Sequence, residues 1–190
     1  MTEDDSLMIR LQEGDRHAFD EIVDKWHGVL IGFFFRNVRD LQLAEDLAQE
    51  TLLKLHQQFW DYLPVGKFRA WLFRMARNLM IDDIRRRSHD VLVRAVKSGT
   101  EINSANAVPD DFAPPDLEVD HTELVALVDE LLDSLPADQR LTFTLHHDAG
   151  LSLPEVAEIM ETSTSTCKSR LRLAREKLAQ MLTHRGITRL

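Results

Sequence analysis

The residues best suited to chemistry are the cations of one segment near the C-terminus. The segment "TSTSTCKSRLRLAREKL" at 162–178 carries three arginines and two lysines against a single acid, Glu176. At 100° per residue, Lys168, Arg172 and Arg175 share one side of a helix with Ser165 and Ser169. Ammonium and guanidinium groups bind phosphates without covalent chemistry, so this pattern favours a nucleic-acid partner. The other side is apolar and is predicted to be buried: Cys167, Leu171, Ala174, Leu178, Met181 and Leu182.

The residues before this segment predict the helix that would position it. Ser152 and Glu155 form an S-x-x-E capping box, and the short turn "ETS" leads to Ser163, which can cap the next helix. Two helices joined by so short a turn favour a helix-turn-helix, whose second helix contacts base edges. Glu161 occupies a turn position that usually holds glycine, because φ there tends to be positive. The alternative is an amphipathic surface helix with its charges in water.

A second basic segment lies at 66–87, with seven Lys and Arg against two Asp. A helical wheel separates an apolar side from a polar side that carries Arg74, Arg77, Asn78 and Arg85. Arginines interleaved with aromatic rings suit phosphate contact and base stacking. The alternative is that the rings are core and the arginines merely solvated. The apolar side and the interleaved aromatics are, together, Phe68, Trp71, Leu72, Phe73, Met75, Ala76, Leu79 and Met80.

A third pattern is the acidic side of the helix predicted at 41–60. Leu53 falls among Asp46, Gln49 and Glu50, opposite the apolar side of this helix. A single exposed leucine is ordinary on a protein surface. An apolar residue framed by acids is also typical of a protein-docking surface. Periodicity alone leaves these two interpretations equal.

Other classes of chemistry find little support in the sequence. We find no Gly-rich phosphate loop, and Cys167 is the sole cysteine, which excludes an internal disulfide. His146 and His147 are adjacent, which is poor geometry for joint metal ligation on a helix. We therefore expect no metal, no cofactor, no small-molecule substrate and no enzymatic activity. No apolar run reaches the length of a membrane helix, and the acidic N-terminus differs from a signal peptide, so we expect a cytoplasmic protein without membrane insertion.

Charge and periodicity together predict the organisation of the chain. The 190 residues carry a net charge of −9, yet residues 96–134 alone hold ten Asp and Glu against one Lys. Helical periodicity runs through both ends and fails in the Pro-containing stretch 98–120, which we interpret as a flexible acidic linker. We predict an all-α protein with two helical domains, at 1–95 and 121–190, joined by the linker at 96–120.

These motifs together resemble the extracytoplasmic-function (ECF) RNA polymerase sigma factors, group 4 of the major bacterial sigma family. The resemblance covers nearly the whole chain, in the family's order. It lies in "EGDRHAF" (13–19), "AEDLAQETLLKLHQQF" (44–59), "FRAWLFRMARNLMIDDIRR" (68–86), "LDSLPADQR" (132–140) and "GLSLPEVAEIMETSTSTCKSRLRLAREKL" (150–178). Departures at Glu161, Cys167 and Leu173 bear on which promoter is recognised rather than on the class.

The resemblance implies roles for the three patterns. The first domain would be sigma region 2 and the second sigma region 4. The acidic side, Asp46, Gln49, Glu50 and Leu53, would dock on core RNA polymerase. The melted minus-ten promoter element would be bound by Phe68, Trp71, Arg74, Arg77, Asn78, Asp82 and Arg85. The duplex minus-thirty-five element would be bound by Ser165, Thr166, Lys168, Ser169, Arg172 and Arg175.

The resemblance also implies a set of partners: core RNA polymerase, promoter DNA as duplex and as melted strand, and an anti-sigma factor. Such a protein recruits polymerase and helps melt the promoter. The competing interpretation is a stand-alone helix-turn-helix regulator whose first domain senses a ligand or dimerises. The basic segment at 66–87 discriminates between them, because a repressor needs only one surface that contacts duplex DNA.

Overall fold

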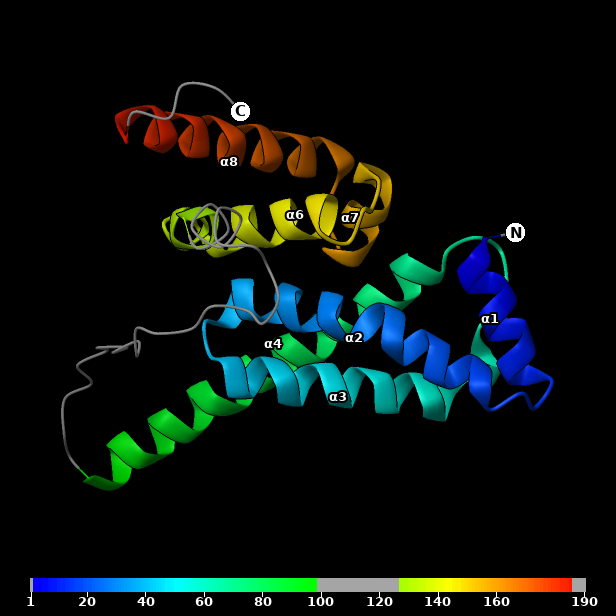
Figure 1. The fold of residues 1–190 in the computed structure, drawn as a ribbon. Coiled ribbons are helices and arrows are strands. Elements are labelled where there is room, and N and C mark those ends of the chain that lie inside the picture. The colour runs from blue at the N-terminus through cyan, green and yellow to red at the C-terminus, as the bar shows by residue number, and fades with distance from the viewer. Residues whose placement is uncertain (1, 99–126, 186–190) are drawn as a thin grey trace.

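The computed structural model describes residues 2–98 and 127–185, and every regular element within those ranges is helical (Figure 1). The first range forms an N-terminal block. The linker predicted at 96–120 falls almost entirely outside the described residues. The helices of the N-terminal block are α1 (Glu3–Gln12), α2 (His17–Val38), α3 (Leu41–Gln58), the short 3-10 helix η1 (Phe59–Asp61) and α4 (Phe68–Ser98).

Side-chain caps fix where the helices of the N-terminal block begin. Thr2 and Asp5 form a capping box at the start of α1, and Asp40 accepts from the backbone N–H of Leu43 at the start of α3. Asp15 lies just before the start of α2. Its carboxylate accepts the N–H of His17 at 3.0 Å, although Arg16 occupies the N-cap position.

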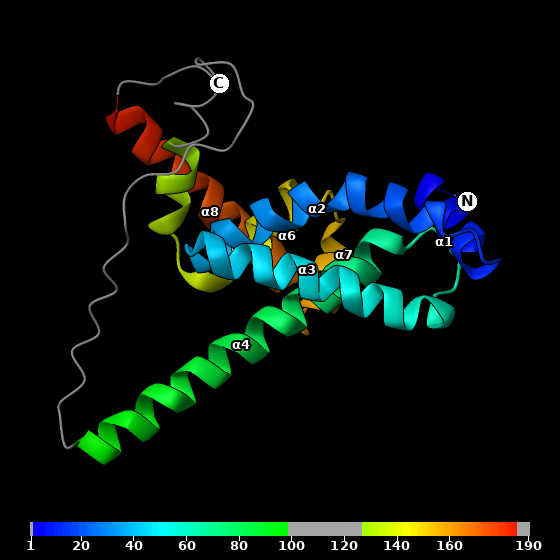
Figure 2. The same ribbon diagram turned by 60° about the horizontal axis from the view of Figure 1, so that its bottom comes forward.

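The apolar sides predicted for α3 and α4 are buried in the core of this block. Phe33, Phe34, Leu55, Leu72 and Phe73 are fully buried between α2, α3 and α4. The basic segment was expected to be helical over 66–87. The helix α4 instead runs on to Ser98, and its far end extends away from the other helices (Figure 2). The core therefore holds only the first half of α4.

The C-terminal block consists of helical residues 127–133 followed by α6 (Ala137–His147), α7 (Leu153–Ile159) and α8 (Thr164–His184). The predicted capping box forms, because the carboxylate of Glu155 accepts the backbone N–H of Ser152 at 2.9 Å. The apolar stripe predicted on α8 is buried, apart from a half-buried Met181. Its members include Ala174, Leu178 and Leu182, which pack on Leu131, Leu132 and Leu135.

The two blocks share one continuous apolar core. Helix α6 packs on α2, and α7 packs on α4, so Leu145 and Val156 belong to the same cluster as Phe33 and Phe73. In Figure 1, α8 lies on the side of α6 and α7 that faces away from the N-terminal block. This arrangement leaves the outer side of α8 free of contacts with α1–α4.

Candidate functional site

The helix-turn-helix predicted from the sequence is formed by α7, a tight turn and α8. The backbone N–H of Thr162 donates to the carbonyl of Ala157, and that of Glu161 donates to Glu158. These two bonds make a Schellman C-cap, whose left-handed residue is Glu161 with φ 52°. Glycine usually holds this position, as the sequence led us to expect. Ala157 is buried against α8, where only a small side chain lets the helices approach.

The α8 surface, by which we mean the residues predicted for the minus-thirty-five element, begins at a capped helix end. Ser163 accepts the backbone N–H of Thr166 at 3.1 Å, as predicted, and its hydroxyl contacts those of Ser165 and Thr166 at 2.8 Å. Three hydroxyls thus gather at the positive end of the helix dipole. The side chains of this surface are exposed, apart from a half-buried Thr166: Ser165, Thr166, Lys168, Ser169, Arg172 and Arg175.

The cations of the α8 surface are held in different ways. Arg172 pairs with Glu176 one turn later, at 2.5 Å, and Arg175 lies 3.0 Å from Nε2 of His147. Burial lowers the pKa of His147, and the charge of Arg175 lowers it further. His147 is therefore neutral near pH 7 and accepts a hydrogen bond from Arg175. Lys168 makes no ion pair with the described part of the chain, so its charge is open to a phosphate.

The arginine strip of α4 comprises Arg74, Arg77, Asn78, Asp82 and Arg85. Asn78, Asp82 and Arg85 are exposed. Arg74 and Arg77 contact the helix-turn-helix: Arg74, whose side chain is 47% exposed, pairs with Glu158 of α7, and Arg77 pairs with Glu161 of the turn at 3.0 Å. The side chain of Arg77 is only 15% exposed, and its Nε makes no hydrogen bond with any described residue.

The aromatic part of the predicted minus-ten set requires a correction at Phe68. Phe68 is 1% exposed and packs against Trp26, Tyr62 and Trp71. Its ring has no open face, so it cannot stack on a base in this structure. Position 68 begins the apolar side of α4, and core packing decides its role. Trp71 is half-buried and retains an accessible edge.

The exposure of three apolar side chains on η1 and the turn before α4 was not predicted from the sequence. Trp60 is 66% exposed, Leu63 is 72% exposed and Val65 is 67% exposed. The rings of Trp60 and Phe59 pack in a tilted arrangement, with centroids 4.5 Å apart, and those of Tyr62 and Trp71 do so at 5.1 Å. The available signal was that Trp60 lies outside the predicted apolar side, next to a Pro-containing turn.

The acidic face of α3, by which we mean Asp46, Gln49, Glu50 and Leu53, lies in solvent. Leu53 is 56% exposed, and the carboxylate of Asp46 accepts a hydrogen bond from Gln42 at 3.3 Å. The other side of α3 packs on α2 and α4. A large apolar side chain thus stands among polar ones, on a helix that the core holds fixed.

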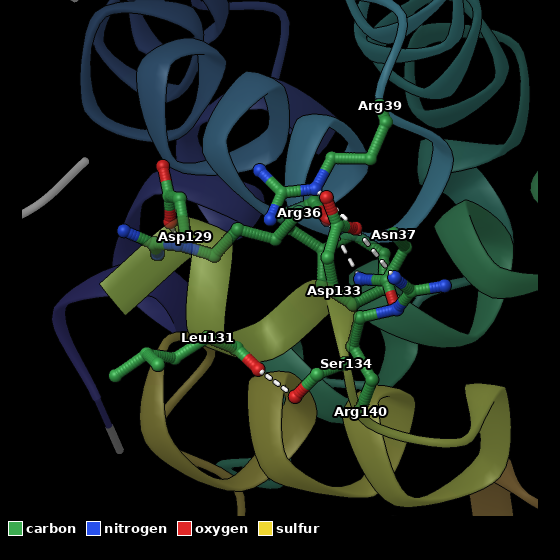
Figure 3. A network of polar contacts seen from close by, with 9 residues as sticks. Arg36, Asn37, Arg39, Asp129, Leu131, Asp133, Ser134 and Arg140 are labelled. Atoms are coloured by element: carbon green, nitrogen blue, oxygen red, sulfur yellow. Dashed lines mark hydrogen bonds and ion pairs between the residues drawn. The ribbon is translucent and has the colours of Figure 1, made fainter. Parts of the chain in front are cut away.

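A polar network between the blocks was not predicted either (Figure 3). Nε of Arg36 lies 2.8 Å from Asp129, and its NH1 lies 3.0 Å from Asp148. Nε of Arg39 lies 2.6 Å from Asp133, which also pairs with Arg140 at 2.9 Å. Among the described residues, the following ion pairs join the two blocks: Arg36–Asp129, Arg36–Asp148, Arg39–Asp133, Arg74–Glu158 and Arg77–Glu161.

Burial shifts the protonation of this network. Burial raises the pKa of the Asp148 carboxyl, and the charge of Arg36 opposes that rise only in part. Burial lowers the pKa of Arg36, but Asp148 and Asp129 together raise it above its ordinary value. Arg36 is thus the cation on which two half-buried acids of the other block depend.

Within the described ranges, no group of three or more His, Cys, Asp and Glu side chains has the arrangement of a metal site. No helix among the described residues is long and apolar enough to cross a membrane.

Comparison with known proteins places the chain in a family. The model of Sigma-70 region 2 matches residues 22–90, and that of Sigma-70, region 4 matches residues 126–178. The RNA polymerase sigma-H factor of Pseudomonas aeruginosa is 31% identical over 95% of this chain and 94% of its own. The ECF RNA polymerase sigma factor SigW of Bacillus subtilis is 30% identical over 91% and 93%.

A solved structure has the same fold. The sigma factor RpoE of Bartonella quintana, in complex with the anti-sigma factor NepR, aligns with a TM-score of 0.68 and 26% identity, over 87% of this chain and 96% of that one. The arginine strip of α4 falls inside the region 2 match, and α7 and the α8 surface fall inside the region 4 match. The chain belongs to the ECF RNA polymerase sigma factors.

Proposed function

We propose that this sigma factor binds promoter DNA through two surfaces, one on each block, while a third surface holds core RNA polymerase. The observation that carries the proposal is the pairing of an exposed helix-turn-helix surface with a separate arginine strip on α4. A protein that binds only duplex DNA needs the first surface alone. The second suits a strand whose bases are unstacked, because guanidinium planes and aromatic edges contact such bases.

The α8 surface is assigned to the minus-thirty-five duplex. Its hydroxyls lie at the N-terminal end of α8, where a recognition helix contacts base edges, and Lys168, Arg172 and Arg175 follow on the same side. Lys168 and Arg172 are placed to bind phosphates, since both are exposed. A phosphate would compete with Glu176 for Arg172, at little cost because that ion pair is exposed.

The arginine strip is assigned to the melted minus-ten element. Arg74, Arg77, Asn78, Asp82 and Arg85 provide donors and acceptors, and the half-buried ring of Trp71 provides apolar contact surface. Phe68 contributes by packing beneath Trp71 rather than by touching DNA. Trp60, Leu63 and Val65, on η1 and the turn that leads into α4, offer exposed apolar surface for a base taken out of the stack.

The acidic face of α3 is assigned to core RNA polymerase. Leu53 supplies an apolar centre, while Asp46, Gln49 and Glu50 supply a polar rim, which is the composition of a protein interface. These roles require recruitment and strand opening rather than covalent catalysis or a cofactor. We also propose a cytoplasmic location and an anti-sigma factor as a further partner, which the complex reported for the Bartonella quintana relative supports.

The test is promoter-dependent transcription with core RNA polymerase from the bacterium that encodes the chain. Wild type is expected to start transcripts at discrete sites. Lys168→Ala/Arg172→Ala should still bind core but lose promoter choice. Asp46→Ala/Leu53→Ala should lose affinity for core. Arg16→Ala/Lys177→Ala, which removes two exposed cations outside the assigned surfaces, is the matched control for the first pair and should transcribe like wild type.

A different result would favour the stand-alone regulator. If wild type neither binds core nor directs specific transcripts, yet binds duplex DNA tightly alone, the sigma function is wrong for this chain. The α8 surface would then serve a repressor or activator, and the arginine strip would have no melted strand to bind.

A further inference from the structure

The arginine strip is divided by the contact between the blocks. Arg85 and Asn78 are exposed and make no hydrogen bond or ion pair with the described residues of the other block. Arg74 and Arg77 form ion pairs with carboxylates of the helix-turn-helix. Glu158 comes from α7 and Glu161 from the turn after it, so both belong to the other block. A carboxylate on a guanidinium occupies the same donors that a DNA phosphate would use. The two acids therefore stand where the melted strand would bind.

Two residues that pair across the blocks have a left-handed backbone. Within residues 2–98 and 127–185, the non-glycine residues with positive φ are Arg39, at 56°, and Glu161, at 52°. Glycine adopts this conformation without strain, whereas other residues do not. Arg39 pairs with Asp133, and Glu161 pairs with Arg77. At both positions a strained backbone carries a charged side chain that reaches the other block.

The pairing leaves Arg77 incompletely satisfied. Its NH1 contacts Glu161, but its Nε is buried and makes no hydrogen bond with the described residues. A buried donor without an acceptor costs free energy. Glu161 is 78% exposed, so its carboxylate gives up little when it returns to water. The contact is therefore one that a better acceptor can displace.

We propose that the free chain covers its own melted-strand site, with Glu158 and Glu161 occupying Arg74 and Arg77 until the blocks separate. This inference rests on the proposed function of the strip. The α8 surface is not covered, because α8 lies on the far side of α6 and α7 (Figure 1). Closure thus blocks binding of the melted strand while leaving the duplex-binding surface open. Separation of the blocks, as core polymerase engages the chain, restores both arginines.

The experiment measures binding of a labelled single-stranded DNA of random sequence to the free chain at low ionic strength. Glu158→Gln/Glu161→Gln keeps the shape of both side chains and removes both charges. It is expected to bind about five- to tenfold tighter than wild type, as removal of two competing ion pairs with exposed carboxylates predicts. The control, Glu13→Gln/Asp24→Asn, removes two exposed acids that make no ion pair with described residues. It should change the affinity for single-stranded DNA less than about twofold.

A second set of variants tests whether the tighter DNA binding of the glutamine variant depends on Arg74 and Arg77. Adding Arg74→Ala/Arg77→Ala to the glutamine variant should abolish the gain, because the liberated guanidinium groups would be absent. The inference is overturned if the glutamine variant binds no tighter than the Glu13→Gln/Asp24→Asn control, or if the gain survives loss of both arginines.

Transcription with core polymerase is measured on the same wild-type preparation. If wild type gives specific transcripts but the glutamine variant binds single-stranded DNA no tighter, the proposed covering of Arg74 and Arg77 is wrong and the sigma function is supported. If the glutamine variant binds single-stranded DNA tighter through Arg74 and Arg77 but wild type gives no transcripts, the covering is supported and the sigma function is wrong.

Discussion

At the scale of single residues, Glu161 serves two structures at once. Its backbone closes the Schellman turn of the helix-turn-helix, and its carboxylate reaches Arg77 of α4. The left-handed backbone costs about 1–2 kcal/mol for a residue with a Cβ atom. The exposed ion pair returns at most about 1 kcal/mol. The local free energy alone therefore favours glycine at this position.

A comparison of two variants isolates the cost of this backbone. Both Glu161→Gly and Glu161→Gln lack the carboxylate, so both lose the pair with Arg77. Only glycine relieves the positive φ, although its freer unfolded chain offsets part of the gain. We expect the glycine variant to be about 1 kcal/mol more stable than the glutamine variant in urea unfolding. Equal stabilities would show that the turn holds Glu161 without strain.

Asp5 gives a prediction of pH dependence. Burial raises the pKa of its carboxyl, but hydrogen bonds from the Tyr62 hydroxyl and from Thr2 outweigh burial and hold the pKa below 3.8. A carboxyl with a lowered pKa stabilises the folded state above its ordinary pKa, and this stability is lost as pH falls through the lowered value. Asp5→Asn should cost about 1–2 kcal/mol at neutral pH.

The measurement is urea unfolding of wild type and Asp5→Asn from neutral pH downward. The difference between them should shrink as the pH falls from 3.8 through the lowered pKa, where Asp5 of the folded wild type also becomes neutral. Asp24→Asn, at an exposed position of α2, is the control and should track wild type throughout. A difference that stays constant with pH would mean that shape, rather than charge, sets the role of Asp5.

At the scale of helices, the start of α8 joins stability to DNA binding. Ser163 accepts the N–H of Thr166 and also contacts the hydroxyls of Ser165 and Thr166. Ser163→Ala should cost about 1 kcal/mol of stability, the usual value of a lost N-cap. Ser163→Asn keeps an N-cap acceptor and should restore most of that stability, as circular dichroism melting would measure.

The same pair of variants tests how the cap affects the α8 surface. With the cap lost, the first turn of α8 frays and the hydroxyls of Ser165 and Thr166 lose their fixed positions. Minus-thirty-five duplex binding, measured in the complete polymerase complex, should weaken for alanine more than for asparagine. If both variants bind duplex equally, the cap stabilises α8 without positioning its hydroxyls.

Local patterns explain how much of these elements could be predicted from sequence. The capping residues Ser152, Glu155 and Ser163 act within three residues, so their hydrogen bonds follow from spacing. The buried stripe of α8 and the exposed side of α3 follow from helical periodicity. The role of Phe68 could not be obtained in this way. A ring at the first position of α4 can point to the core or to solvent, and packing with Trp26 and Tyr62 decides which.

At the scale of the whole molecule, contact between the blocks was beyond sequence reasoning. Arg36 and Asp129 are 93 residues apart, and no local pattern relates them. The apolar residues of α6 and α7 pack within their own block, on each other and on α8. They also pack on α2 and α4, which unites the two blocks in one core.

Arg36 links the N-terminal block to two acids of the C-terminal block. Its side chain is 25% exposed, while those of Asp129 and Asp148 are 13% and 20% exposed. Replacing the cation leaves two half-buried carboxylates facing each other without a partner. Removing one member of a buried pair costs about 3–5 kcal/mol, so we expect about 2–4 kcal/mol here for Arg36→Gln. Arg16→Gln removes an exposed cation without an ion pair to described residues and should cost less than about 0.5 kcal/mol.

Because the lost interaction joins the blocks, it should separate their unfolding. Wild type and Arg16→Gln should unfold in one urea transition. Arg36→Gln should unfold in two, with the C-terminal block unfolding first because its own core is smaller.

Asp148, whose pKa burial already raises, should titrate at still higher pH in Arg36→Gln. Its ionisation opposes closure as pH rises through that pKa, and protonation at lower pH removes the penalty. The two transitions should therefore merge again as the pH falls through that pKa. A single transition at neutral pH in Arg36→Gln would instead show that the apolar contacts alone hold the blocks together.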